Sequence, residues 1–140
     1  AALPREIWES YLKISIERNP WDRVLSQYWW DRSGREDYPP FSTWLAKRAK
    51  RGTHRVSNWD IYAIGDEPVA SHLLRYETLD ADLSALGREI GVPELAMPEV
   101  RAKSGVRPDR RHYRDVLSPE DAGRVADICR REITLLGYEF

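Results

Sequence analysis

Two side chains that suit phosphate binding, Arg18 and Ser26, lie eight positions apart, the first just before a predicted helix and the second within it. An arginine presents a planar fork of N–H donors that fits a phosphate, and a serine hydroxyl can donate one more hydrogen bond. The first turn of a helix adds unpaired N–H groups and a partial positive charge. This segment could therefore bind an anion, with Arg23 on the same helix face as Ser26. The alternative is that Arg18 forms a structural ion pair.

The hydrophobic pattern predicts the elements that position this corner. Apolar and polar residues alternate over residues 11–17, which predicts a strand whose apolar face consists of Leu12, Ile14 and Ile16. A helix then begins at Pro20, with Asn19 as its N-cap. The i, i+3, i+4, i+7 spacing predicts its buried face, formed by Trp21, Val24, Leu25 and Tyr28. Ligands of open α/β sheets gather at the carboxyl ends of strands, which is where this strand meets the helix.

The rest of the chain alternates between helix and strand. We expect further helices over residues 3–10, 41–52, 78–91 and 118–137. Two strands are predicted at residues 59–64 and 70–76, across a turn at 65–68, with polar loops at 32–40 and 92–117. This order predicts an α/β fold, a parallel sheet flanked by helices with a short hairpin. No repeat, low-complexity tract or linker divides the sequence, so residues 1–140 are expected to form a single domain.

The composition excludes several classes of protein. With 41% hydrophobic and 32% charged residues, the chain has the balance of an ordinary globular domain. Its apolar runs are far shorter than the roughly 20 residues needed to span a bilayer, and no secretory leader is evident. We therefore expect a cytoplasmic protein without a membrane partner. Cys129 is the only cysteine, which excludes an internal disulfide, and it is expected to be buried on a helix.

Basic residues gather in two segments, 47–55 and 101–114, although the net charge of the chain is only −1. A near-neutral total argues against a surface built for nucleic acid, whereas two local clusters favour a local anion site or an acidic polysaccharide. Nucleic-acid binding is kept as an alternative, in which Trp44 and Trp59 would be platforms for stacked bases.

Residues 18–26, Arg-Asn-Pro-Trp-Asp-Arg-Val-Leu-Ser, resemble the motif with which sulfotransferases bind the 3′-phosphate of 3′-phosphoadenosine 5′-phosphosulfate (PAPS). The resemblance implies that Arg18 and Ser26 bind this phosphate. Residues 74–79, Leu-Arg-Tyr-Glu-Thr-Leu, followed by Asp82, are similar to the Arg-Tyr-Glu-Asn-Leu junction between strand and helix in that family. This second similarity implies that Tyr76 lies beside the adenine.

A late segment extends the resemblance. Residues 103–107, Lys-Ser-Gly-Val-Arg, and residues 112–115, His-Tyr-Arg-Asp, resemble the loop that closes over PAPS in bacterial and carbohydrate-type sulfotransferases. The similarity implies further contacts to PAPS from Lys103, Ser104 and Arg107. The final segment, residues 136–140, is similar to the usual end of these enzymes.

The resemblance covers residues 8–140 and implies the C-terminal portion of a sulfotransferase domain, with part of the P-loop-like sulfotransferase fold. The implied activity is transfer of a sulfuryl group from PAPS to a hydroxyl of a small-molecule or carbohydrate acceptor, without a metal. The Pro-Lys-Thr-Gly-Thr-like loop that holds the 5′-phosphosulfate in the family is absent from the sequence. We therefore expect an N-terminally truncated chain that transfers no sulfate alone. The alternative is a nucleotide-binding module of the same fold that has lost catalysis.

Two questions about individual side chains stay open at this point. No catalytic base is identified, and the candidates are His54, His72 and His112, of which His72 lies in a predicted strand and suits a structural role better. Glu17 occupies a position that is usually apolar in the family. Its carboxylate needs a partner, for which Arg18 and Arg23 are the candidates.

Overall fold

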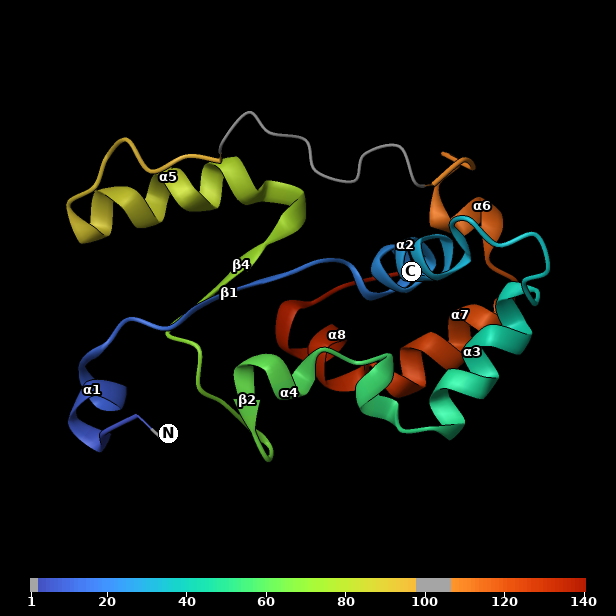
Figure 1. Ribbon diagram of the computed structural model, residues 1–140. Coiled ribbons are helices and arrows are strands. Elements are labelled where there is room, and N and C mark those ends of the chain that lie inside the picture. Colours follow the sequence, from blue (N-terminus) through green and yellow to red (C-terminus); the bar gives the residue numbers. More distant parts are fainter. Residues whose placement is uncertain (1–2, 98–106) are drawn as a thin grey trace.

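A small parallel sheet lies at the centre of the computed structural model, which describes residues 3–97 and 107–140 (Figure 1). Strand β1 (Ile14–Glu17) pairs with β4 (His72–Arg75), in a register that runs from Ile14 opposite His72 to Glu17 opposite Arg75. Parallel strands need a long crossover, and here the crossover contains helices, so the chain is α/β as the alternation predicted. The register places the carboxyl ends of the two strands side by side.

Helix α2 (Pro20–Arg32) begins three residues after β1 ends. The side chain of Asn19 caps it by accepting hydrogen bonds from the backbone N–H groups of Trp21 and Asp22, which confirms the predicted N-cap. All four residues of the predicted apolar face are buried, namely Trp21, Val24, Leu25 and Tyr28. The strand-to-helix corner therefore has the local structure that the sequence predicted.

A layer of helices packs around α2 and holds the main core (Figure 1). It consists of α3 (Phe41–Lys50), α6 (Tyr113–Val116), α7 (Pro119–Ile128) and α8 (Arg130–Leu136). Ser118 caps α7 by accepting a hydrogen bond from the N–H of Asp121, as its sequence position predicted. The predicted last helix is interrupted at Cys129, where the backbone leaves the helical region and α8 restarts one residue later. Cys129 is fully buried, as expected.

Two further helices, α1 (Arg5–Ser10) and α5 (Leu79–Ile90), lie away from this layer, at the left of Figure 1. Helix α5 follows β4 and packs against it through Leu74, Leu79 and Leu86. It ends at Gly91, whose φ of 77° is the left-handed conformation that glycine adopts most easily. In the described part of the chain, no helix has the length and apolar character required to cross a bilayer.

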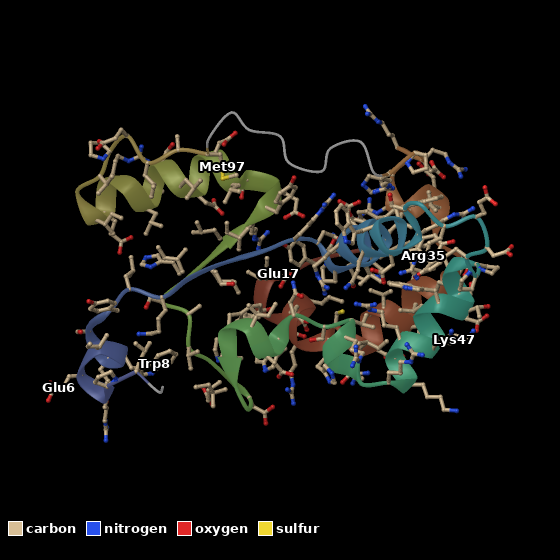
Figure 2. All side chains as sticks on the ribbon, in the orientation of Figure 1. Glu6, Trp8, Glu17, Arg35, Lys47 and Met97 are labelled. Carbon is tan, nitrogen blue, oxygen red and sulfur yellow. The ribbon has the colours of Figure 1, made fainter. Side chains whose placement is uncertain are left out.

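In strand β1, the side chains that were predicted to form the apolar face are exposed. Ile14 and Ile16 are 46% and 45% exposed, whereas Glu17 is fully buried. Figure 2 shows Glu17 where the strands meet the helical layer. A charged side chain is almost never fully buried unless it is paired. The burial of Glu17, in place of the isoleucines, therefore depends on the partners of its carboxylate.

The predicted strand at residues 59–64 is mostly wrong. Its first four residues form the single helical turn α4 (Trp59–Tyr62), and only β2 (Ala63–Ile64) is extended, in a minimal hairpin with β3 (Glu67–Pro68). The turn forms because Ser57 accepts a hydrogen bond from the Trp59 N–H, and because it brings the rings of Trp59 and Tyr62 to 5.7 Å from each other. The predicted strand at 70–76 exists as β4, but its partner is β1 rather than residues 59–64.

Two short 3-10 turns complete the described chain, η1 (Thr53–Arg55) and η2 (Tyr76–Thr78).

The aromatic platforms suggested for nucleic-acid bases are buried. Trp44 and Trp59 are only 5% and 6% exposed, so neither ring can stack on a base, and that part of the nucleic-acid alternative is wrong.

Candidate anion-binding site

Arg18 lies between the end of β1 and the start of α2, and its guanidinium makes two kinds of contact. Its Nε donates a hydrogen bond of 2.7 Å to Oδ2 of Asp22, and its Nη2 forms an ion pair with the same oxygen. Its guanidinium carbon also lies 4.8 Å from the centre of the Tyr76 ring. Tyr76 directly follows β4, so the parallel pairing of β1 and β4 brings these two predicted site residues together.

Arg107 reaches the same carboxylate from the far end of the chain. Its Nη1 donates to Oδ1 of Asp22 at 2.8 Å, while Nε and Nη2 donate to the backbone carbonyls of Asp109 and Arg111. One arginine therefore occupies each oxygen of Asp22. Asp22 lies in the first turn of α2, where the helix dipole favours an acidic side chain. Its position four residues after Arg18 is the sequence signal that could have indicated the ion pair.

The backbone N–H groups at the start of α2 are satisfied within the protein. Asn19 Oδ1 accepts from the N–H groups of Trp21 and Asp22 at 3.1 and 3.4 Å, and the Asn19 N–H donates to Glu77 Oε1 at 2.6 Å. Glu77, which the sequence reasoning missed, also accepts a hydrogen bond from the Tyr138 hydroxyl at 3.0 Å. The capacity of this corner to bind an anion therefore depends on the guanidinium groups rather than on the helix N–H groups.

Ser26 lies on α2 one turn beyond Asp22, which is about 6 Å along the helix axis. It is half-buried, and its hydroxyl makes no hydrogen bond to another described residue. No direct contact joins Ser26 to Arg18, so a bound ligand would have to bridge them.

Arg23 is three residues before Ser26 on α2, but its guanidinium binds inside the protein and takes no part in the candidate anion site. Its Nε donates to Glu17 Oε1 at 3.1 Å, and its Nη1 donates to the carbonyl of Val56 at 2.6 Å. The buried carboxylate of Glu17 attracts this guanidinium into the protein. The partner expected for Glu17 is thereby identified as Arg23, with a further hydrogen bond from the backbone N–H of Arg18.

A buried acidic cluster lies behind the corner. Burial raises the pKa of Glu17, an effect that exceeds the opposing attraction of Arg23. Glu132, also fully buried, accepts hydrogen bonds from the Ser57 hydroxyl and the Asn58 N–H. The second carboxylate oxygen of each glutamate has no hydrogen-bond partner. Two buried acids therefore share the neighbourhood of one arginine.

Three of the six predicted site residues come together: Arg18 and Arg107 both bind Asp22, and Tyr76 contacts Arg18. Ser26 lies on the same helix. Lys103 and Ser104 fall outside the described residues. An apolar hollow of about 420 Å³ lies elsewhere, lined by residues that include Trp21, Leu117 and Phe140 but none of these predicted ones.

The three candidate bases have different surroundings. His112 caps α6, and its ring centre lies 4.1 Å from that of Tyr113, whose hydroxyl accepts a hydrogen bond from the Asn19 side chain. His72 bonds to Glu89, which fits its structural interpretation, and His54 lies in the exposed turn η1. Among the contacts of the described residues, His112 is the one candidate base that connects to the cap of α2, through Tyr113. Within residues 3–97 and 107–140, no cluster of His, Cys, Asp or Glu could hold a metal ion.

Comparisons of the chain with protein-family models, with curated proteins and with solved structures found no match. Two guanidinium groups around one carboxylate, beside an aromatic ring that is 52% exposed, can bind an anion together with a flat ring.

Proposed function

We propose that this chain binds the 3′-phosphate and the adenine of PAPS, as part of a sulfotransferase that transfers the sulfuryl group to a hydroxyl of a small-molecule or carbohydrate acceptor. The observation that carries the proposal is the stack of the Arg18 guanidinium on the Tyr76 ring, beside the carboxylate that Arg18 shares with Arg107. The resemblance of residues 18–26 and 74–79 to sulfotransferase motifs also assigns Arg18 and Tyr76 to the same ligand.

The contacts of each side chain fit its proposed role. Arg18 is 30% exposed and keeps donors on Nη1 that no described residue uses. The free hydroxyl of Ser26 adds one hydrogen bond on the same helix. Half of the Tyr76 surface is open, and stacking of a base on an aromatic ring contributes roughly 1–3 kcal/mol.

Sulfuryl transfer makes demands similar to those of phosphoryl transfer. The acceptor oxygen bonds to sulfur as the bond between sulfur and the 5′-phosphate oxygen breaks, and a base takes the proton of the acceptor hydroxyl. The side chains described above would bind and orient the nucleotide, which leaves as 3′-phosphoadenosine 5′-phosphate (PAP). His112 is the candidate base that the structure links to this corner, through Tyr113 and Asn19.

A second candidate function is a nucleotide-binding module without catalysis. It is favoured by the fact that each site residue brought together here has a binding role, and that His112 already accepts a hydrogen bond from the N–H of Arg114. Binding and transfer therefore need separate measurements.

Calorimetry with PAP and with 5′-AMP tests the binding proposal. A charge-assisted contact contributes about 1.5–3 kcal/mol, so PAP should bind roughly ten- to a hundredfold more tightly than 5′-AMP. Arg18→Ala should remove most of this preference, and Ser26→Ala part of it. Arg88→Ala, an exposed arginine on α5, serves as the control for a general loss of positive charge. Equal affinities for the two nucleotides in the wild-type chain would overturn the proposal.

For the protein that includes any residues encoded before Ala1, an assay with a labelled sulfate donor and a panel of sugar and small hydroxyl acceptors separates the two candidate functions. Transfer that is lost in Arg18→Ala supports the enzyme. Tight PAP binding without transfer to any acceptor supports the binding module.

A further inference from the structure

The apolar hollow of about 420 Å³ lies between α2, α6, α7 and the side chain of Phe140. Its volume is within the range of pockets that hold small ligands, roughly 300–1,000 Å³. Trp21, Leu117 and Ala122 line the hollow and are buried, whereas Phe140 lines it and is 43% exposed. The hollow therefore has an apolar floor that is open to solvent at one edge, and an apolar group that entered it would leave water.

One charged side chain, that of Arg114, lines this hollow. Its guanidinium carbon lies 5.8 Å from the centre of the Tyr113 ring, and its Nη2 donates a long hydrogen bond of 3.5 Å to the carbonyl of Glu139. No carboxylate side chain in the described part of the protein forms an ion pair with Arg114. An exposed guanidinium with unused donors can bind the carboxylate of a ligand.

Gly123 provides a second, independent observation. It lies in the middle of α7 with an ordinary helical backbone, where glycine destabilises a helix relative to alanine. A Cβ at this position would meet no atom within 4 Å, so neither the backbone nor the packing requires a glycine. Because Gly123 lines the hollow, the absence of a side chain keeps space open there.

We propose that this hollow is a binding site for a small aromatic molecule that carries one anionic group. The ring of the ligand would lie on the apolar floor near Trp21 and Phe140, whose ring centres are 5.4 Å apart, and the anionic group would pair with Arg114. Aromatic walls favour an aromatic ligand, because rings attract one another edge to face. The inference goes beyond the proposed function, since none of the described residues that contact Asp22 or Tyr76 at the anion-binding corner lines the hollow.

The probe is 2-naphthoate, and it is compared with 2-naphthamide, which has the same rings without the charge. Calorimetry should show the carboxylate binding at least about tenfold more tightly than the amide, because a charge-assisted contact is added to the same apolar burial. Arg114→Gln should remove most of this difference and leave the affinity for the amide unchanged. Arg110→Gln, at an exposed arginine that does not line the hollow, is the matched control and should behave like the wild-type chain.

Variants of Gly123 test the place of binding. Gly123→Leu should occupy the hollow and weaken the binding of 2-naphthoate at least about tenfold, while the open space at this position lets the helix keep its structure. Thr134→Leu adds a leucine at an exposed, uncharged position of α8 and should leave binding unchanged. Gly123→Ala should raise the urea midpoint of unfolding and weaken binding less than leucine does.

Nitrogen-15 NMR spectra locate the probe directly, because the amide signals of Gly123 and Ala126 should shift when 2-naphthoate is added. The affinity should be the same in Arg18→Ala, so the result does not depend on the phosphate corner. The inference is overturned if 2-naphthoate fails to bind at millimolar concentration, if Gly123→Leu binds it as well as the wild-type chain does, or if the amide binds as tightly as the carboxylate. Melting curves of each variant show that the compared proteins are folded.

Discussion

The guanidinium carbon of Arg18 lies 4.8 Å from the ring centre of Tyr76, which is 58 residues further along the chain. The contact exists because β1 and β4 are parallel and in register, so that their carboxyl ends deliver these side chains to one place. A ring covered on one side by an arginine and open on the other is suited to stacking on a nucleotide base.

Tyr76→Ala should weaken binding of PAP by roughly 1–3 kcal/mol, because the stacking surface for the base is lost. The preference for PAP over 5′-AMP should change little, since the phosphate contacts remain. Calorimetry with both nucleotides measures the two quantities. Tyr76 is 52% exposed, so the variant should lose little stability, and a large drop in melting temperature without a binding defect would contradict this role. Tyr76→Phe is the control that keeps the ring.

Asn19→Ala should destabilise the fold by about 0.5–2 kcal/mol, because the cap of α2 is removed. The variant should also reduce the preference for PAP over 5′-AMP, since the corner that holds Arg18 loses its hydrogen bonds to Trp21, Asp22 and Tyr113. Urea denaturation and calorimetry give the two values. Ser118→Ala removes the cap of α7 and is the matched control, with a similar loss of stability. An equal loss of nucleotide preference in both variants would show that Asn19 affects binding only through the stability of the fold.

Glu17→Gln should flatten the dependence of stability on pH above 4.5. Burial raises the pKa of Glu17 above its ordinary value of 4.5. The contribution of Glu17 to the free energy of unfolding is therefore most favourable below pH 4.5. This contribution is lost as the pH rises through the higher pKa of the folded state. Denaturation of both proteins at a series of pH values from 4.5 to 7.5 measures the difference.

The stability of Glu17→Gln relative to the wild-type chain should accordingly increase across this range. Glu6→Gln is the control, because Glu6 is an exposed residue of α1 (Figure 2). Parallel pH profiles for the wild-type chain and Glu17→Gln would show that the buried carboxylate keeps its charge at no cost.

Cys129 should resist alkylation in the folded protein at pH 8. Burial raises the pKa of its thiol to about 12, so almost no thiolate is present, and the side chain is inaccessible. A thiol reagent should modify it only as the protein unfolds, which can be followed by mass spectrometry in increasing urea. Full modification in dilute buffer, at the rate found in urea, would contradict the buried position.

The elements that the sequence predicted well are those that depend on neighbouring residues. Asn19 and Pro20 determine where α2 begins, and the spacing of Trp21, Val24 and Leu25 determines which face is buried, all within a few residues. Local capping and periodicity could therefore be identified without any knowledge of the fold.

The strand partners and part of the site could not be predicted in this way. The alternation at 70–76 indicated a strand, but only the packing of the whole chain pairs β4 with β1 rather than with its neighbour in sequence. Asp22 joins Arg107 across 85 residues, and the direction of the Arg23 side chain depends on a carboxylate buried behind the helix. Contacts between residues so far apart leave no recognisable pattern among neighbouring residues of the sequence.

The bridge from Arg107 to Asp22 also has a consequence for synthesis of the protein. Translation adds roughly 5–20 residues per second, and Arg18 and Asp22 are synthesised well before Arg107. Asp22 can therefore pair with Arg18 before Arg107 has been added to the chain. The second arginine joins only when residues 107–111 fold back onto α2, so the arginine pair around Asp22 is completed late and depends on the contact between two distant segments.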